Sequence, residues 1–286
     1  MVEEAASAAH LETQTEEHQK LRVSRVSELR QPHILTFDTT KYPLREALVA
    51  WMISATDPER DGGHFPARED LSQMHTFSNH KCSEVDRDKA GNDMGCYQSR
   101  WNRLRDQQGE VYKGINQDKP SPEYLHFESI YKELIRDVIG PSIDGGRVLY
   151  QRAPTFRTYL PSVVPMGKMH NDESYHHQPS ELNLWLPISD HVSGNNSLWV
   201  ETAPGKGDFH PLNLEFGQIY RGWLNQCRHF TQVNDTGYTR VSIDFRVVSE
   251  ASGGHDPSFH AGVRRGAKAC FQTKFDVGGF YEDMFV

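Results

Sequence analysis

The sequence predicts a mainly β fold, a jelly roll or barrel whose strands are braced by α-helices. After residue 146 the chain becomes a series of short strand-like runs separated by turn residues, as in all-β cores of this kind. Before that point, two segments place apolar residues at the spacing of amphipathic helices. A chain of 286 residues is long enough for one such domain with a small appendage.

The N-terminal region starts with polar sequence and then becomes apolar. Residues 1–30 are charged and lack aromatic side chains, so we expect a frayed helix or a flexible tail. The run "HILTFDTT", residues 33–40, is typical of a first strand. Residues 44–52, "LREALVAWM", carry an apolar stripe at i, i+3, i+4, i+7 and i+8, which predicts a helix that faces the core.

A second helix is indicated from Ser121 onward. Ser121 is a suitable N-cap, and Pro122 suits the first helical position. The apolar residues that follow form one face, and we expect Gly140 and Pro141 to end the helix.

The stretch between the two helices is polar and irregular. Residues 57–119 are rich in Asp, Arg, Gly, Asn and His, so the segment is a candidate lid over a site or a mobile surface insertion. No internal repeat is visible. We therefore expect one domain after the tail, residues 31–286, with helices and the lid in 31–146, the jelly-roll core in 147–250 and a C-terminal extension in 251–286.

The strand-like runs of the core follow one another closely. They read "RVLYQRA", "TFRTYLP", "LNLWLPI", "SLWVETA", "GQIYRGW", "RHFTQV" and "RVSIDFRVV". In the last run apolar and polar residues alternate as in a half-buried strand, with Val241, Ile243 and Phe245 set against Ser242, Asp244 and Arg246. The glycines of "TAPGKGDF" resemble a phosphate-binding loop only superficially, because no Gly-Lys-Ser/Thr follows.

Composition excludes several classes of partner. The net charge of -8 argues against nucleic-acid binding, which needs a concentrated basic face. No apolar run reaches the roughly 20 residues of a membrane helix, and the acidic N-terminus lacks the apolar core of a signal peptide. The four cysteines form no CxxC pair, so neither a zinc ribbon nor a disulfide framework is indicated. We expect a cytoplasmic protein with a small-molecule substrate and no membrane partner.

The run "GKMHNDESYHH" contains the strongest chemical signal. If His170 and Asp172 lie on or just past a strand, residues i and i+2 point to the same side and can hold one face of a cation. A further ligand is available from His229 in a later strand-like run. Two histidines and one carboxylate form the facial triad of non-haem Fe(II) oxygenases. The alternatives are a solvated turn around Asp172 and a buried His229 bonded to backbone.

Arg240 and Ser242 make the pattern more specific. HxD, a distal histidine, and then arginine with serine two residues on resembles the Fe(II)/2-oxoglutarate-dependent oxygenases. In that family the arginine pairs with the distal carboxylate of 2-oxoglutarate, and the serine often assists. A guanidinium matches a carboxylate bidentately and keeps its charge when desolvated. The alternative is an ion pair of Arg240 with Asp235 or Asp244, in which case Arg246 would be the fallback partner for the cosubstrate.

The resemblance covers roughly residues 147–250 and extends to the surrounding sequence. The chain resembles in particular the oxygenase-like proteins named for streptomycin biosynthesis and phytanoyl-CoA-hydroxylase-like proteins. It implies a double-stranded β-helix core with Fe(II) as cofactor and 2-oxoglutarate and O2 as cosubstrates. Related halogenases have glycine or alanine in place of the aspartate, so Asp172 favours hydroxylation or another oxidation.

Five further residues are candidates near the site. If the neighbouring leucines fill the outer core, Asn183 points inward and can contact 2-oxoglutarate, as can Tyr159, whose buried hydroxyl needs a partner. Arg157 shares the face of Tyr159 and is a candidate substrate contact. His176 and His177 follow the metal motif and either touch substrate or belong to a solvated loop.

The sequence therefore predicts an enzyme that oxidises a small polar metabolite, such as an amino acid or a natural-product intermediate. The expected reaction is hydroxylation, desaturation or cyclisation at an unactivated C–H bond, with release of succinate and CO2. One alternative is a cupin-type isomerase, epimerase or dioxygenase that uses no 2-oxoglutarate. Another is a binding module that kept the fold without activity.

Overall fold

The computed structural model describes residues 17, 19–54, 71–73, 120–159, 161, 165, 167–259 and 277–286. In these residues the strands form three sheets, and the pairs of named strands are all antiparallel. Of the candidate lid, residues 57–119, only 71–73 fall within this part of the chain. Leu71 is buried in the main core, and the Ser72 carbonyl accepts a hydrogen bond from the Thr239 backbone N–H at 2.7 Å.

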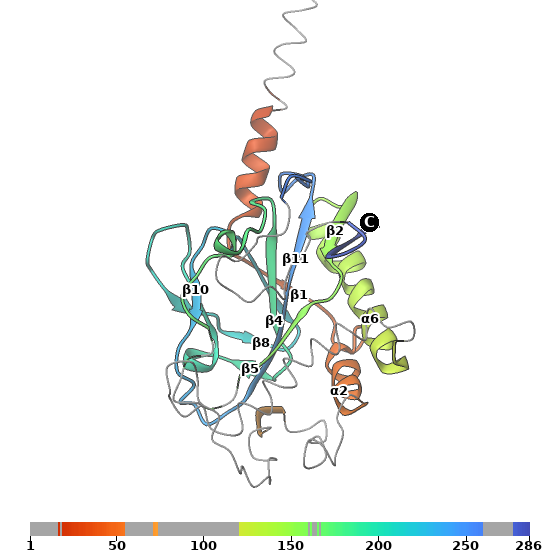
Figure 1. The fold of residues 1–286 in the computed structure, drawn as a ribbon, viewed down its shortest axis with the longest axis vertical. Helices are drawn as coiled ribbons and strands as arrows, with labels where there is room; N and C mark the ends of the chain where they lie inside the picture. Colours follow the sequence, from red (N-terminus) through yellow and green to blue (C-terminus); the bar gives the residue numbers. More distant parts are fainter. Residues whose placement is uncertain are drawn as a thin grey trace, which may run out of the picture.

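A seven-stranded sheet forms the centre of the molecule (Figure 1). Its longest strand, β11, pairs with β4 along one edge and with both β3 and β2 along the other. In order across the sheet the strands are β1 (His33–Thr36), β9 (Gln218–Gly222), β4 (Leu182–Pro187), β11 (Arg240–Ser249), β2 (Arg147–Gln151) and β12 (Tyr281–Phe285), and β3 (Thr155–Tyr159) pairs with the first half of β11.

Two smaller sheets lie on one side of this sheet, where β10 is seen in Figure 1. An apolar cluster packs between the large sheet and the two smaller ones. It includes Trp185 and Tyr220 of the large sheet and Val200 of β6. The first of the smaller sheets is β10 (His229–Thr231), β6 (Leu198–Val200) and β7 (His210–Pro211), and the second is β5 (His191–Val192) with β8 (Leu214–Glu215). Two 3-10 turns, η3 (Asp172–Tyr175) and η4 (Gly194–Asn196), lie in the connections.

Helices cover the opposite side of the large sheet, as Figure 1 shows for α2 and α6. Helix α2 (Leu44–Ser54) packs on α6 (Pro122–Leu134), which begins at the expected N-cap, where Ser121 Oγ accepts from the Tyr124 N–H at 3.2 Å. The helix does not stop at Gly140. It continues as a π-helix, η2 (Ile135–Ile139), and a short α7 (Gly140–Ser142).

The reason for Gly140 is packing against the end of the chain. A Cβ at this position would lie 2.7 Å from a methyl group of Val286, so any larger residue would displace the C-terminus. Pro141 lies in α7, the last short stretch of the helix, which follows directly after the π-helix. The expected helix end was therefore wrong by a few residues.

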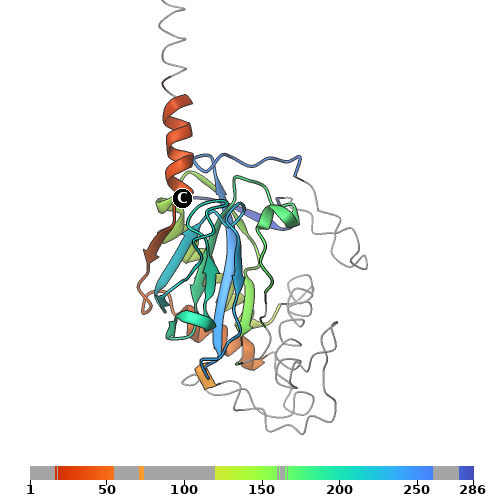
Figure 2. The ribbon, with the colours of Figure 1, turned by 90° about the vertical axis from the view of Figure 1, so that its left-hand side faces the viewer.

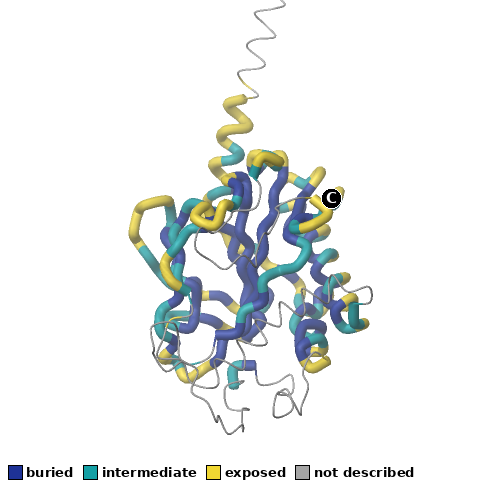
Figure 3. The backbone as a smooth tube through the Cα atoms, viewed as in Figure 1, coloured by how far each residue is buried: buried dark blue, intermediate teal, exposed yellow. Residues whose placement is uncertain are grey.

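Residues 19–29, within the stretch expected to be a frayed helix or a flexible tail, form a helix that stands out from one end of the body (Figures 1 and 2). Most of this helix is exposed, as Figure 3 shows. Leu29 in its last turn is fully buried. Arg25 pairs with Asp144 of the body. None of the helices in the described part of the chain is long and apolar enough to cross a membrane.

Strand β11 separates an apolar layer from a polar one. Its residues Val241, Ile243, Phe245 and Val247 join the core beneath the helices, together with the alternate leucines of β4. The residues between them face the smaller sheets and are also buried, which differs from the expected half-exposed strand. We call these four buried residues, Arg240, Ser242, Asp244 and Arg246, the polar layer of the sheet. The candidate site lies on this side of the sheet.

Candidate metal centre

The two histidines of the motif are brought together by backbone pairing. His170 and His229 form an isolated antiparallel bridge in which each backbone N–H donates to the other residue's carbonyl, at 3.1 and 2.8 Å. Their side chains therefore leave the backbone side by side, and their ring centroids are 4.3 Å apart. This pairing explains why the residues meet although they are distant in the sequence.

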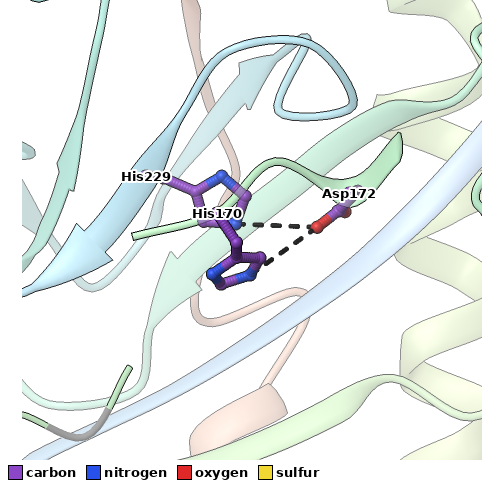
Figure 4. Close-up of side chains that lie close together, drawn as sticks. All are labelled: His170, Asp172 and His229. Atoms are coloured by element: carbon purple, nitrogen blue, oxygen red, sulfur yellow. Dashed lines mark ion pairs between the residues drawn. The ribbon is translucent and has the colours of Figure 1, made fainter. Parts of the chain in front are cut away.

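Asp172 completes the cluster from the first residue of η3. Its backbone N–H donates to the Leu224 carbonyl at 3.0 Å, which fixes the turn next to the two histidines. Asp172 Oδ1 lies 4.0 Å from Nε2 of His170 and 3.6 Å from Nε2 of His229 (Figure 4). One ligand atom from each of the three residues lies within 4.8 Å of the others, as a metal-binding group requires.

Hydrogen bonds fix the form of both imidazoles. Nδ1 of His170 faces the Lys168 carbonyl at 2.7 Å, and Nδ1 of His229 faces the Cys227 carbonyl at 3.2 Å. A carbonyl only accepts, so we assign the proton to Nδ1 in each ring, which leaves the Nε2 lone pairs directed toward Asp172. Burial lowers the pKa of His229 to about 4, so this ligand is neutral at pH 7.

The other carboxylate oxygen of Asp172 is held by the sheet. Oδ2 accepts from Nδ2 of Asn183 at 2.7 Å and from Nε and Nη2 of Arg246 at 3.1 and 2.8 Å. Burial alone would raise the pKa of Asp172, but Arg246 and the neighbouring histidines outweigh it and hold the pKa far below its usual range. The carboxylate is thus charged and oriented, with Oδ1 directed to the histidines.

Arg246 also belongs to a wider ion network on the buried polar layer. Its Nη1 donates to Asp244 at 3.0 Å, and Asp244 in turn accepts from Nε and Nη2 of Arg157. Arg157 comes from β3, opposite Ser242, and its side chain keeps 38% of its surface exposed. Arg246 therefore orients Asp172, the candidate metal ligand. Because its donors are used by Asp172 and Asp244, Arg246 is a poor alternative to Arg240 for binding the carboxylate of a cosubstrate.

Arg240 lies in the same layer but has a different environment. Its only described side-chain hydrogen bond runs from Nη1 to the Asn196 carbonyl at 2.9 Å, and its guanidinium carbon lies 5.0 Å from the ring centroid of Tyr159 and 5.6 Å from that of Trp185. Neither Asp235 nor Asp244 pairs with it. Burial, with a smaller contribution from Arg157, lowers the pKa of Arg240 to about 9.

Two buried polar atoms on the same face of β11 have no hydrogen-bond partner within the described residues: Nε of Arg240 and Oγ of Ser242. Buried polar groups are rarely left without hydrogen bonds, and each such group costs about 1–3 kcal/mol. A carboxylate accepts from both guanidinium and hydroxyl groups. The observed donors therefore fit the distal carboxylate of a dicarboxylic cosubstrate, and the His-Asp-His group fits Fe(II).

The remaining candidates are placed as follows. Asn183 supports Asp172 through its amide nitrogen, while its buried Oδ1 has no hydrogen-bond partner in the described ranges. Tyr159 donates its hydroxyl to the Gln232 carbonyl and presents its ring to Arg240. His176 is exposed and ends η3 in the left-handed region, at φ 67°, whereas Nδ1 of His177 lies 2.7 Å from Glu181. Their roles toward cosubstrate and substrate stay predictions.

The glycine-rich loop after β6, residues 202–209, binds a carboxylate of the chain itself. The Glu201 carboxylate, which is fully buried, accepts from the backbone N–H groups of Gly205, Gly207 and Arg228 and from the Arg228 side chain. The loop amides thus surround an anion that belongs to the chain itself. This contact also holds Arg228, the residue before the metal-ligand candidate His229.

Glu201 should make the fold sensitive to acid. Burial alone would raise its pKa, but Arg228 and the loop amides lower it to about 2 from an ordinary value of 4.5. The folded form therefore gains stability that is complete above about pH 4.5 and is lost as the pH falls toward 2, about 3 kcal/mol in all. Urea unfolding of the wild type and Glu201→Gln between pH 3 and 7 tests this, and the stability difference between the two chains should be constant above about pH 5 and should fall by roughly half by pH 3.

No protein-family model matches the chain. A streptomycin biosynthesis protein, StrG, of Streptomyces griseus is 36% identical over 123 residues, which are 43% of this chain and 57% of that protein. The chain thus spans little more than half the length of this relative. The match confirms the similarity to proteins of streptomycin biosynthesis that the sequence indicated.

Solved structures give looser likenesses. AviO1 from Streptomyces viridochromogenes is 13% identical over 82% of this chain and 98% of its own, with a TM-score of 0.43. CytC3 with Fe(II) and alpha-ketoglutarate is 13% identical over 79% of this chain and 76% of its own, with a TM-score of 0.37. Neither superposition is close enough to decide what this chain does.

Sequence reasoning placed the metal ligands together but missed their supports. Asp244 and Arg246 share the face of Arg240 by the same two-residue period, so the alternation of β11 already contained this signal. The carbonyls of Lys168 and Cys227, which orient the histidines, are backbone groups. Every residue has such a group, so the residue types at these positions could not predict the contacts.

Proposed function

We propose that this protein is a non-haem Fe(II)- and 2-oxoglutarate-dependent oxygenase with a double-stranded β-helix core. The observation that carries the proposal is the coincidence of two features on one buried polar layer. One is the His-Asp-His group with both Nε2 atoms free to bind a cation. The other is a buried guanidinium that has no carboxylate partner in the described part of the chain.

In this proposal His170, Asp172 and His229 hold the iron through Nε2, Oδ1 and Nε2. Three ligands on one face leave the opposite face open for cosubstrates. When bound, Fe(II) together with 2-oxoglutarate and O2 would supply the oxidising power that breaks an unactivated C–H bond, with release of succinate and CO2. The protein contributes binding, orientation and exclusion of water.

Each of the chain's own groups has a defined task. Arg246 and Asn183 keep the Asp172 carboxylate charged and turned toward the metal. Arg240 and Ser242 bind the distal carboxylate of 2-oxoglutarate, while the rings of Tyr159 and Trp185 exclude water around the guanidinium. A charged pair strengthens in such a dry environment, which favours a dicarboxylate over a monocarboxylate.

The substrate is proposed to be a small polar metabolite, in keeping with the similarity to a streptomycin biosynthesis protein. Arg157 is the most exposed charged group of the polar layer, and Asp244 uses only part of its five N–H donors. Arg157 is therefore the candidate contact for a hydrogen-bond acceptor group of the substrate. Hydroxylation is the expected reaction, and desaturation or cyclisation would need only a different position of the substrate.

Anaerobic addition of Fe(II) and 2-oxoglutarate tests the proposal. A weak visible charge-transfer band should appear only when both are present, because it requires the keto acid to bind at the iron. Succinate formation should then depend on O2. Iron binding without the band would contradict the proposal and favour a cupin-type enzyme that uses no 2-oxoglutarate.

A further inference from the structure

A second buried polar cluster lies behind the metal centre and involves the C-terminal strand. Tyr281, the first residue of β12, is fully buried, and so are Gln178 and Glu181 of the segment that leads from η3 to β4. None of these residues belongs to the metal or cosubstrate groups described above. The cluster joins two parts of the chain that are about a hundred residues apart.

Tyr281 holds this segment through side chains. Nε2 of Gln178 donates to the Tyr281 hydroxyl at 2.9 Å, and the hydroxyl donates to Oε1 of Glu181. Burial and the adjacent Glu181 carboxylate raise the pKa of Tyr281, so the hydroxyl keeps the proton that it donates. The other oxygen of Glu181 lies 2.7 Å from Nδ1 of His177. The hydroxyl thereby holds the side chains of Gln178 and Glu181 directly, and Glu181 in turn contacts His177.

The strand itself is firmly fixed. Tyr281 pairs with Gln151 of β2, and the Arg152 backbone N–H donates to the Phe280 carbonyl at 2.9 Å. The side chain of Gln151 also accepts from Nη1 of Arg246 at 3.3 Å. Strand β12 is therefore paired with a residue that contacts Arg246, the support of Asp172.

The segment that Tyr281 holds lies between Asp172 and a residue that orients Asp172. It follows η3, which begins at Asp172, and it leads to Asn183 of β4, which donates to Asp172 Oδ2. The His177 backbone N–H also faces the Asp172 carbonyl at 3.3 Å. Displacement of Glu181 or His177 would thus move both the carboxylate and the amide that orients it.

We propose that Tyr281 is a positioning residue of the metal centre, through which β12 fixes the segment carrying Asp172 and Asn183. This inference depends on the metal site of the proposed function. Asn225 and Trp223 also hold the segment, but they bind its backbone carbonyls at 177–179. Tyr281 instead fixes the side chains of Gln178 and Glu181, which lie between Asp172 and Asn183.

Cobalt titration of the full-length chain tests the role of Tyr281. Co(II) bound by two histidines and a carboxylate gives visible absorption, so its dissociation constant can be measured without turnover. Tyr281→Phe should raise this constant about tenfold, the lower part of the range for loss of an outer support of a metal ligand. Tyr131→Phe is the matched control, because Tyr131 is also fully buried and donates one hydrogen bond, to the Gln151 carbonyl.

The two tyrosine variants should lower the thermal midpoint of the metal-free protein by similar amounts, whereas only Tyr281→Phe should weaken Co(II) binding. Glu181→Gln keeps an acceptor for the Tyr281 hydroxyl and should weaken binding less than Tyr281→Phe. Unchanged binding in Tyr281→Phe, an equal loss in Tyr131→Phe, or a larger loss in Glu181→Gln would each overturn the inference. Failure of the wild type to bind Co(II) would instead overturn the metal site and the proposed function.

Discussion

Replacing Arg240 with methionine should raise the dissociation constant of 2-oxoglutarate for the iron-loaded protein by about a hundredfold or more. Loss of one partner from a buried, hydrogen-bonded charge pair costs about 2–5 kcal/mol, and about 2.8 kcal/mol corresponds to a hundredfold. Titration of the charge-transfer band with 2-oxoglutarate under anaerobic conditions measures the effect directly, without a known substrate.

The same substitution should leave the metal-free protein as stable as the wild type or more stable. Without cosubstrate, the Arg240 guanidinium is desolvated, and the one hydrogen bond described for it goes to a backbone carbonyl. Removal of an uncompensated buried charge is therefore neutral or favourable. Thermal unfolding in the absence of 2-oxoglutarate should show this, and added 2-oxoglutarate should stabilise the iron-loaded wild type more than the variant.

Arg221→Met provides a matched control on the other side of the sheet. Arg221 is also buried, donates from Nη1 to one backbone carbonyl, that of Ser142, and leaves Nε without a partner among the described residues. Burial lowers its pKa as well. It belongs to β9 and points toward the helices, so its loss should not alter 2-oxoglutarate binding. An equal effect of both substitutions would contradict the assignment of Arg240.

The parts of the fold that the sequence predicted are those with a strong local period. The alternation of β11 and the stripes of α2 and α6 appear in the structure at close to the expected positions. The two-residue strands β5, β7 and β8 exist only through pairing with distant residues, so they have no period to detect. Strand β12 was not expected either, because its place beside β2 is decided by tertiary packing.

The candidate site shows the same division. His170, Asp172 and His229 could be selected because metal chemistry restricts residue type and spacing. Their mutual arrangement depends on a backbone bridge and on η3, which is a 3-10 turn where a strand was one option considered. The task of Arg246 could not be read from residue type, because an arginine on this face serves a ligand carboxylate and a protein carboxylate equally well.

Asp172→Ala should abolish iron-dependent succinate formation and weaken Fe(II) or Co(II) binding by more than about a hundredfold, since loss of an outer support alone costs 10–100-fold. Retained turnover would contradict the ligand assignment. Loss of activity by itself does not distinguish a missing ligand from a damaged fold, because Asp172→Ala also leaves Arg246 and Asn183 without their shared acceptor. That loss should cost about 3 kcal/mol of unfolding free energy.

A second substitution separates the two effects of Asp172→Ala. Adding Arg246→Met removes the unpaired charge, while Asp244 keeps its other partner, Arg157, so much of the lost stability should return. Metal binding should not return, because a ligand oxygen is still missing. Asp244→Ala is the control, since it takes a different buried carboxylate from the same arginine and should retain metal binding. Recovery of metal affinity in the double variant would mean that Asp172 acts through Arg246 rather than as a ligand.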